Sequence, residues 1–194
     1  MLTVLTTIGW LACVVYSTIP SFWLMIHPRA EAWRARRTSP YSVLLPVWVA
    51  MWATAAAITW RWRTEQFYTS LAGWIPAIAL FATGIWLYHQ AGVNFGWKEL
   101  GGVPELHHRE QRLITSGIRA HVRHPVYLAH LVEMSAWSVG TGLAVCYVLT
   151  AFAIVSGILM IHAEDRELEA RFGDAYREYR RAVPGILPRF RAPR

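Results

Sequence analysis

The sequence predicts an all-α fold, a polytopic membrane bundle of about five transmembrane helices with an amphipathic C-terminal helix. Three observations lead to this prediction. The chain of 194 residues is 55% hydrophobic and only 16% charged, whereas a soluble domain of this length would carry more charge. Its apolar residues gather in runs close to the roughly 20 residues that cross a bilayer as a helix. Several of its 11 tryptophans flank those runs, where indole rings favour the membrane interface.

Five apolar runs are the candidate spans. They cover residues 2–26, 41–60, 71–91, 126–139 and 143–161. The last two are short and are separated only by Gly140, Thr141 and Gly142, so we expect them to form a tight helical hairpin. The first run has neither a charged n-region nor a small-residue cleavage site, and we therefore expect it to be a retained helix.

The basic residues predict the orientation of these spans. All but two of the 19 lysines and arginines fall in the connections that share a side with the C-terminus, and only Arg61 and Arg63 fall on the other side. By the positive-inside rule the N-terminus faces outward and the C-terminus lies in the cytosol. The net charge of +7 then suits anionic lipid headgroups rather than nucleic acid, because the arginines follow the topology.

The chain is predicted to be a single integral membrane domain, residues 1–194. Residues 1–70 form scaffold helices with few chemically suggestive side chains, and polar content rises from Gly84 onward. Residues 104–116 are expected to form a short helix that Gly117 caps. The two cysteines, Cys13 and Cys146, both lie inside spans, so neither a disulfide framework nor a metal site is expected. No obligate protein partner is predicted.

Two motifs near the end of the chain carry the chemistry. The first is RHPVY at residues 123–127, where Pro125 suits the first turn of the fourth span. The second is E-D-x-x-L-x-x-x-F-G-x-x-Y-x-x-Y at residues 164–179. Apolar residues then recur at helical spacing and predict one amphipathic helix that ends before Pro184. Its apolar positions are Leu168, Phe172, Tyr176, Tyr179 and Val183.

Two of the charged residues in these motifs are expected to meet. Glu164 lies at the end of the fifth span, where a carboxylate needs a cationic partner or ligand. The hairpin brings it to His124, at the matching end of the fourth span. Glu167 and Arg171 share a helix face with Glu164. For Glu167 and Arg171, an ordinary exposed ion pair is as good an interpretation as a role in the site.

These motifs resemble the isoprenylcysteine carboxyl methyltransferase family, within a wider group of membrane methyltransferases that includes phospholipid methyltransferases. The resemblance rests on RHPVY after LITSGIRAHV, and on Glu164-Asp165, Phe172-Gly173, Tyr176 and Tyr179. It covers residues 84–190, the expected methyltransferase core. It implies S-adenosylmethionine as the methyl donor, S-adenosylhomocysteine as the product and a lipophilic acceptor that enters from the bilayer. No dinucleotide-binding glycine fingerprint is present.

The resemblance also assigns residues to roles. Arg123, Glu164 and Glu167 are the expected catalytic residues, with Glu164 as the partner of the donor's ammonium group. The donor site would lie on the cytosolic side. Its expected residues are Leu113, Ile114, Gly117, Arg119, His124, Pro125, Tyr127 and Glu164. The acceptor is expected to meet Tyr88, Glu133 and Arg171, and Glu133 stands out as an ionisable group within a span.

The sequence departs from the carboxyl-methylating relatives at two positions. Those relatives carry arginines in the third span and before the glutamate pair, where this chain has Tyr88 and Met160. Protein-S-isoprenylcysteine O-methyltransferase is still the nearest match, but phospholipid, amine or thiol methylation remains open. Two other classes also remain: an NADPH-dependent sterol-type membrane reductase, and a membrane transporter or scaffold that uses His130 and Glu133.

Overall fold

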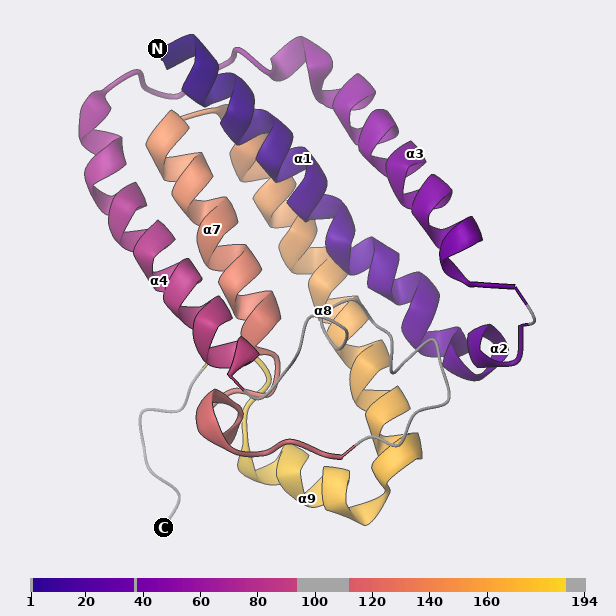
Figure 1. Cartoon of the computed structure of the whole chain (residues 1–194). Helices are drawn as coiled ribbons and strands as arrows, with labels where there is room; N and C mark the ends of the chain where they lie inside the picture. Colours follow the sequence, from indigo (N-terminus) through magenta and orange to yellow (C-terminus); the bar gives the residue numbers. More distant parts are fainter. Residues whose placement is uncertain (1, 37, 94–111, 188–194) are drawn as a thin grey trace.

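The computed structural model describes residues 2–36, 38–93 and 112–187, and these fold into a bundle of long helices (Figure 1). Within these residues the backbone is helical or irregular, apart from an isolated bridge between Gln66 and Leu143. The long helices are α1 (Leu2–Ile26), α3 (Tyr41–Thr59), α4 (Trp74–Gly92), α7 (Pro125–Thr141) and α8 (Ala144–Phe172). Two shorter helices are α2 (Ala30–Arg34) and α9 (Asp174–Ala182). The predicted all-α class is confirmed.

In the described part of the chain, four helical segments are long and apolar enough to cross a membrane. They contain α1, α3, α4 and α8 and cover Thr3–Arg34, Tyr41–Trp62, Leu71–Gly92 and Ala144–Phe172. The predicted fourth span corresponds to α7, which has 17 residues and lies beside α4 and α8. The chain is therefore a polytopic helical membrane protein.

The outer faces of the long helices are apolar. Exposed side chains include Ile58 on α3, Ile75 on α4 and Val155 on α8, each more than 60% exposed. Exposed apolar surface of this extent is rare on a soluble monomer, whereas a bilayer covers it without penalty. The interior is filled from α1, α7 and α8 by Trp10, Cys13, Val14, Met134, Cys146, Leu149 and Ala153.

The predicted hairpin between α7 and α8 is confirmed. α7 ends at Thr141, and Gly142 turns the chain with a φ of +65°, a left-handed conformation that favours glycine. The Gly142 amide donates to the carbonyl of Ser138 at 2.9 Å. The turn places the start of α7 and the far half of α8 at the same end of the bundle. We call this the site end, where α1 and α4 also finish (Figure 1).

The C-terminal helix differs from its prediction. α8 continues through the expected span end to Phe172, so Glu164 and Glu167 belong to the spanning helix itself. The helix then stops at Gly173, whose φ of +59° and ψ of −131° suit a residue without a side chain. α9 begins directly afterwards and lies across the site end (Figure 1). The expected single amphipathic helix is thus two helices at an angle.

The short helix expected over residues 104–116 lies mostly outside the described residues. Its described end, residues 112–116, is not helical. Gly117 does not cap a helix there. It adopts a φ of +64° at the start of a short 3-10 turn, Gly117–Ala120, which leads into the RHPVY motif.

Candidate functional site

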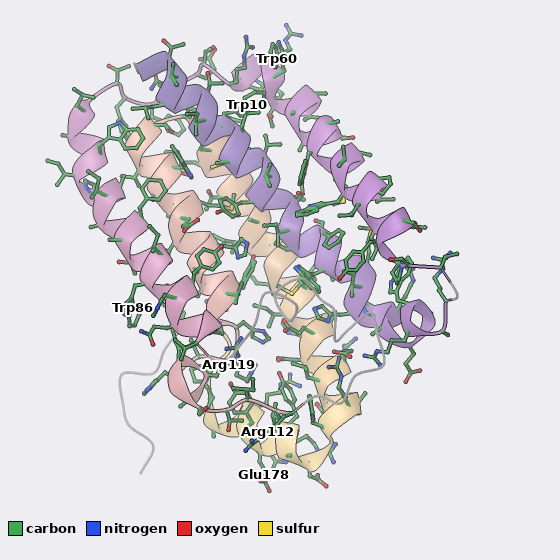
Figure 2. All side chains as sticks on the ribbon, in the orientation of Figure 1. Trp10, Trp60, Trp86, Arg112, Arg119 and Glu178 are labelled. Carbon is green, nitrogen blue, oxygen red and sulfur yellow. The ribbon has the colours of Figure 1, made fainter. Side chains whose placement is uncertain are left out.

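Polar side chains gather at the site end of the bundle. Figure 2 shows Arg112, Arg119 and Glu178 there, while Trp10 and Trp60 mark the opposite end. The backbone of the RHPVY motif is fixed by the chain that follows α9. The amides of Arg123 and His124 donate to the carbonyls of Pro184 and Gly185 at 2.9 and 3.0 Å. Pro125 then starts α7 without sacrificing a hydrogen bond.

His124 lies between two carboxylates of α8. Its Nδ1 is 2.9 Å from Glu164 Oε2, and its Nε2 is 3.1 Å from Asp165 Oδ1. Both nitrogens must carry hydrogen to face two carboxylates, so the ring is an imidazolium. Burial by itself would lower the pKa of His124, but Glu164 and Asp165 outweigh it and raise the pKa to about 9. The predicted meeting of His124 and Glu164 is therefore present.

Asp165 ties three elements together. Its Oδ2 accepts a hydrogen bond from Arg123 Nη2 at 2.8 Å, and its Oδ1 accepts one from the Tyr176 hydroxyl on α9. Arg123 also donates to the carbonyls of Arg180 and Val183, both at 2.9 Å. Arg123 is thus held in a clamp between α8 and the segment around α9.

Glu164 differs from Asp165 in its exposure. The Glu164 side chain is 28% exposed, against 5% for Asp165. Only Oε2 of Glu164 is engaged by His124. Within the part of the chain that the structure describes, Oε1 accepts no hydrogen bond. One carboxylate oxygen at this span end is therefore available to a cationic ligand.

Four other expected donor-site residues precede the RHPVY motif in the chain. Arg119 is buried, and its Nη1 donates to the carbonyl of Ala91 at the end of α4, at 3.0 Å. Burial lowers the pKa of Arg119, and the charges of Tyr179 and Glu164 oppose that shift. Leu113 and Ile114 are half-buried, and Gly117 is exposed.

Tyr127 lies one turn into α7, on the bundle side of His124. Its hydroxyl donates to the carbonyl of Ala153, and its ring packs with Met160 and Ile161. A side-chain carbon on Gly157 would overlap the Tyr127 hydroxyl, so α8 has a glycine where this ring passes. Tyr127 thus forms the apolar layer directly above the His124–Glu164 pair.

Glu167 belongs to a second charged cluster. Its Oε1 accepts hydrogen bonds from Arg34 Nη2 at 2.9 Å and from Arg171 Nη2. Its Oε2 faces His27 Nδ1 at 3.8 Å. The expected ion pair between Glu167 and Arg171 is present, but it is not exposed, because the Glu167 side chain is only 10% exposed. Sequence reasoning treated His27 and Arg34 as scaffold. The signal that would have found His27 is His27-Pro28 at a span end, which repeats His124-Pro125.

A further polar cluster lies deeper among the helices. Tyr16 on α1 donates to Glu133 Oε2 on α7 at 2.7 Å. His130 stands edge-on to Tyr16 and to Tyr88 of α4, with ring centroids 5.1 and 5.3 Å apart. A side chain on Gly84 would come within 2.6 Å of Glu133, so α4 leaves room for this carboxylate. The structure thus joins Tyr88 and Glu133 through His130 and Tyr16, but it places Arg171 in the separate Glu167 cluster.

Comparison with known proteins places these motifs among methyltransferases. The chain is 29% identical over 117 residues to the protein-S-isoprenylcysteine O-methyltransferase of Schizosaccharomyces pombe, an overlap of 58% of this chain and 48% of that protein. It is 30% identical over 153 residues to methanethiol S-methyltransferase 2 of Bradyrhizobium diazoefficiens, covering 70% of this chain and 55% of that protein. It is 29% identical over 154 residues to methanethiol S-methyltransferase of Mycobacterium tuberculosis, covering 76% and 59%.

The matched region spans only about half the length of these relatives. No protein-family model and no solved structure matches the chain. The predicted resemblance to the isoprenylcysteine group is confirmed, and the methanethiol group stands beside it at a similar level of identity.

Proposed function

Because the chain is a distant homologue of isoprenylcysteine carboxyl methyltransferases and methanethiol S-methyltransferases, members of one family of membrane methyltransferases, we propose that it is an S-adenosylmethionine-dependent membrane methyltransferase. The acceptor is a lipophilic molecule. The names of the relatives suggest two classes of methylated group, a prenylated cysteine carboxylate and a thiol. S-adenosylhomocysteine is the product.

The residues at the site end fit the amino acid part of this donor. Its ammonium group needs an anionic partner that is not already satisfied, and Glu164 Oε1 offers one beside a buried span end. Arg119 supplies a buried positive charge near the same carboxylate, suited to the donor's own carboxylate group. Both ring nitrogens of His124 are engaged by carboxylates, so His124 serves the site by fixing Glu164 rather than by donating to the ligand.

The remaining proposed roles follow from position. Leu113, Ile114 and Gly117 precede the RHPVY motif and would border the adenine, while Pro125 and Tyr127 shape the floor of the donor site. The donor supplies an electrophilic methyl group. Since methyl transfer from a sulfonium needs little acid catalysis, these residues act mainly by holding the reactants in line.

The catalytic residues proposed from the sequence divide into two kinds. Glu164 is expected to contact the donor and Glu167 to act next to it, whereas Arg123 would act through Asp165 as a positioning residue. For the acceptor, Tyr88 and Glu133 line the interior cluster, and Arg171 lies beside Glu167 at the water-facing end. An acceptor from the bilayer would meet the donor between the interior cluster of Tyr88 and Glu133 and the water-facing cluster of Glu167.

The proposed topology has five spans in one domain of residues 1–194, with α7, fourth in chain order, added to the four apolar segments. Arg61 and Arg63 lie at the end opposite the site, and the remaining described basic residues lie at the site end or its loops. The positive-inside rule then puts the N-terminus outside and the donor site in the cytosol. The bilayer is the only partner proposed. Neither nucleic acid nor an obligate protein partner is needed.

The observation that carries this proposal is the half-engaged Glu164 beside the buried imidazolium of His124. Calorimetry on the detergent-purified protein tests it. We expect saturable binding of S-adenosylhomocysteine and none of NADPH. Tight NADPH binding without a response to S-adenosylhomocysteine would instead place the chain among membrane reductases.

A further inference from the structure

One face of α8 carries two histidine–glutamate pairs. Glu164 and Glu167 are three residues apart and therefore neighbours on the helix surface. His124 approaches Glu164 from the start of α7, at 2.9 Å, and His27 approaches Glu167 from the end of α1, at 3.8 Å. The second pair thus lies about one helical turn from the proposed donor contact.

The two histidines differ in how far they are engaged. His124 has a carboxylate on each nitrogen and is a fixed cation, so it has no lone pair with which to take up a proton. His27 makes no such pair of contacts. Among the described residues, its Nδ1 and the facing Glu167 Oε2 are both buried without a hydrogen-bond partner. A small shift would close the 3.8 Å between them into a hydrogen bond.

The surroundings of this pair fix its orientation. Arg34 and Arg171 both donate to Glu167 Oε1, which leaves Oε2 turned toward His27. The His27 ring stacks on Trp23, with centroids 5.3 Å apart and planes 24° apart. Trp23 in turn packs against the cluster of Tyr127, Met160 and Ile161, the layer directly above the His124–Glu164 pair. His27 therefore borders the level at which an acceptor would meet the donor.

We propose that His27 is the general base of the reaction and that Glu167 positions it, so that the enzyme takes a protic acceptor, a thiol. This inference rests on the proposed methyltransferase function. Glu167 Oε2 accepts the Nδ1 hydrogen of His27, and Nε2, which has no hydrogen-bond partner among the described residues, takes the proton of the acceptor S–H bond. The acceptor sulfur forms a bond to the methyl carbon as the carbon–sulfur bond of the donor breaks. The sulfonium becomes a neutral thioether, and His27 later returns the proton to water.

A carboxylate acceptor would not need this base, because it is already ionised at neutral pH. A thiol does need it, since the thiolate is the nucleophile and an alkanethiol is mostly protonated at neutral pH. General-base catalysis typically contributes a factor of about 100 or more. A base should therefore speed the methylation of a weakly acidic thiol far more than that of a thiol that is already ionised.

The experiment compares wild type and His27→Gln with ethanethiol and with pentafluorothiophenol, an acidic thiol that is ionised without help. We expect His27→Gln to lose about 100-fold in kcat with ethanethiol and less than about threefold with pentafluorothiophenol. Calorimetric affinity for S-adenosylhomocysteine should stay within about threefold. The melting temperature in detergent should stay at the wild-type value. Glu167→Gln should also lose more kcat with ethanethiol than with pentafluorothiophenol, but its loss with ethanethiol should be smaller than that of His27→Gln. His162→Gln, an exposed histidine on α8, is the matched control and should change neither rate.

An equal loss with both thiols would give His27 a purely structural role and overturn this inference alone. Full activity of His27→Gln with ethanethiol would overturn it as well. A wild-type protein that neither binds S-adenosylhomocysteine nor methylates either thiol would overturn the proposed function, and this inference with it.

Discussion

Tyr176 on α9 donates its hydroxyl hydrogen bond to Asp165 on α8, the carboxylate that also holds His124 and Arg123. Burial and the Asp165 carboxylate raise the pKa of Tyr176, so it stays a donor throughout the accessible pH range. The contact folds α9 back under α8 after the break at Gly173. Of the adjacent acids, Asp165 therefore organises the protein, while Glu164 remains available to a ligand.

We expect Asp165→Asn to lower the free energy of unfolding by about 3 kcal/mol or more, because breaking a buried ion pair leaves its partners uncompensated. The Asp165 side chain is 5% exposed and faces both Arg123 and His124. Thermal unfolding in detergent measures the effect. Asp174→Asn is the control, since that side chain is 89% exposed, and it should cost less than about 1 kcal/mol. Similar losses for the two variants would contradict the central role of Asp165.

The sequence predicted the His124–Glu164 contact because a tight hairpin leaves little freedom in which ends meet. The span lengths and the Gly140–Gly142 turn were sufficient to predict this contact. It did not predict the role of Asp165, whose partner Tyr176 reaches it only because Gly173 breaks the helix. The periodicity of Leu168 to Val183 continues across that break, so a pattern of spacing cannot reveal it. The His27 pair was missed since His27 is 140 residues from Glu167 along the chain, and only tertiary packing joins them.

Stability should fall as the pH rises through the titration of His124. The pKa of His124 is raised to about 9 in the folded protein, against about 6.5 for a free histidine. Below pH 6.5 the ring is protonated in both states and its pairing contributes fully. Between pH 6.5 and 9 this contribution declines, by a total on the order of 3 kcal/mol. Melting temperatures measured from pH 6 to 10 check it.

His124→Gln should flatten that pH dependence, and His121→Gln, at an exposed histidine in the same loop, should leave it intact. A wild-type melting temperature that rises between pH 7 and 9 would contradict the assignment of an imidazolium. The neighbouring carboxylates do not disturb the comparison, because they are ionised over the whole range.

Glu164→Gln keeps the shape of the side chain and removes its charge. If Glu164 holds the donor's ammonium group, affinity for S-adenosylhomocysteine should fall tenfold or more, since charge-assisted hydrogen bonds contribute about 1.5 to 3 kcal/mol. Calorimetry measures it. Glu169→Gln on the same helix is the control and should leave affinity unchanged, because the described partners of Glu169 are Arg177 and Arg180 on α9. Unaltered binding by a well-folded Glu164→Gln protein would reduce Glu164 to a partner of His124.

Gly157 should tolerate no side chain, because a methyl group there would overlap the Tyr127 hydroxyl. We expect Gly157→Ala to destabilise the protein by about 2 kcal/mol, as overpacking in a filled interior does. Tyr127→Phe removes only the nearest clashing atom, because the ring carbons Cζ and Cε1 would still overlap the added methyl group, so the double variant should recover part of the loss. Gly92→Ala is the control, since no atom of the described residues lies within 4 Å of its added carbon, and it should be neutral or stabilising. Additive losses in the double variant would show that the cost of Gly157→Ala does not come from its contact with Tyr127.

The last prediction concerns the acceptor. The carboxyl-methylating group has arginines where this chain has Tyr88, edge-on to His130, and Met160, buried beside Tyr127. Neither side chain carries the positive charge of arginine, so wild type should form little methyl ester on a farnesylated cysteine analogue while methylating ethanethiol. The Tyr88→Arg, Met160→Arg variant should raise ester formation. A Tyr88→Gln, Met160→Gln variant is the control, because it adds polar length without charge and should gain nothing. Robust ester formation by wild type would mean that another cation, with Arg171 the first candidate, holds the acceptor carboxylate.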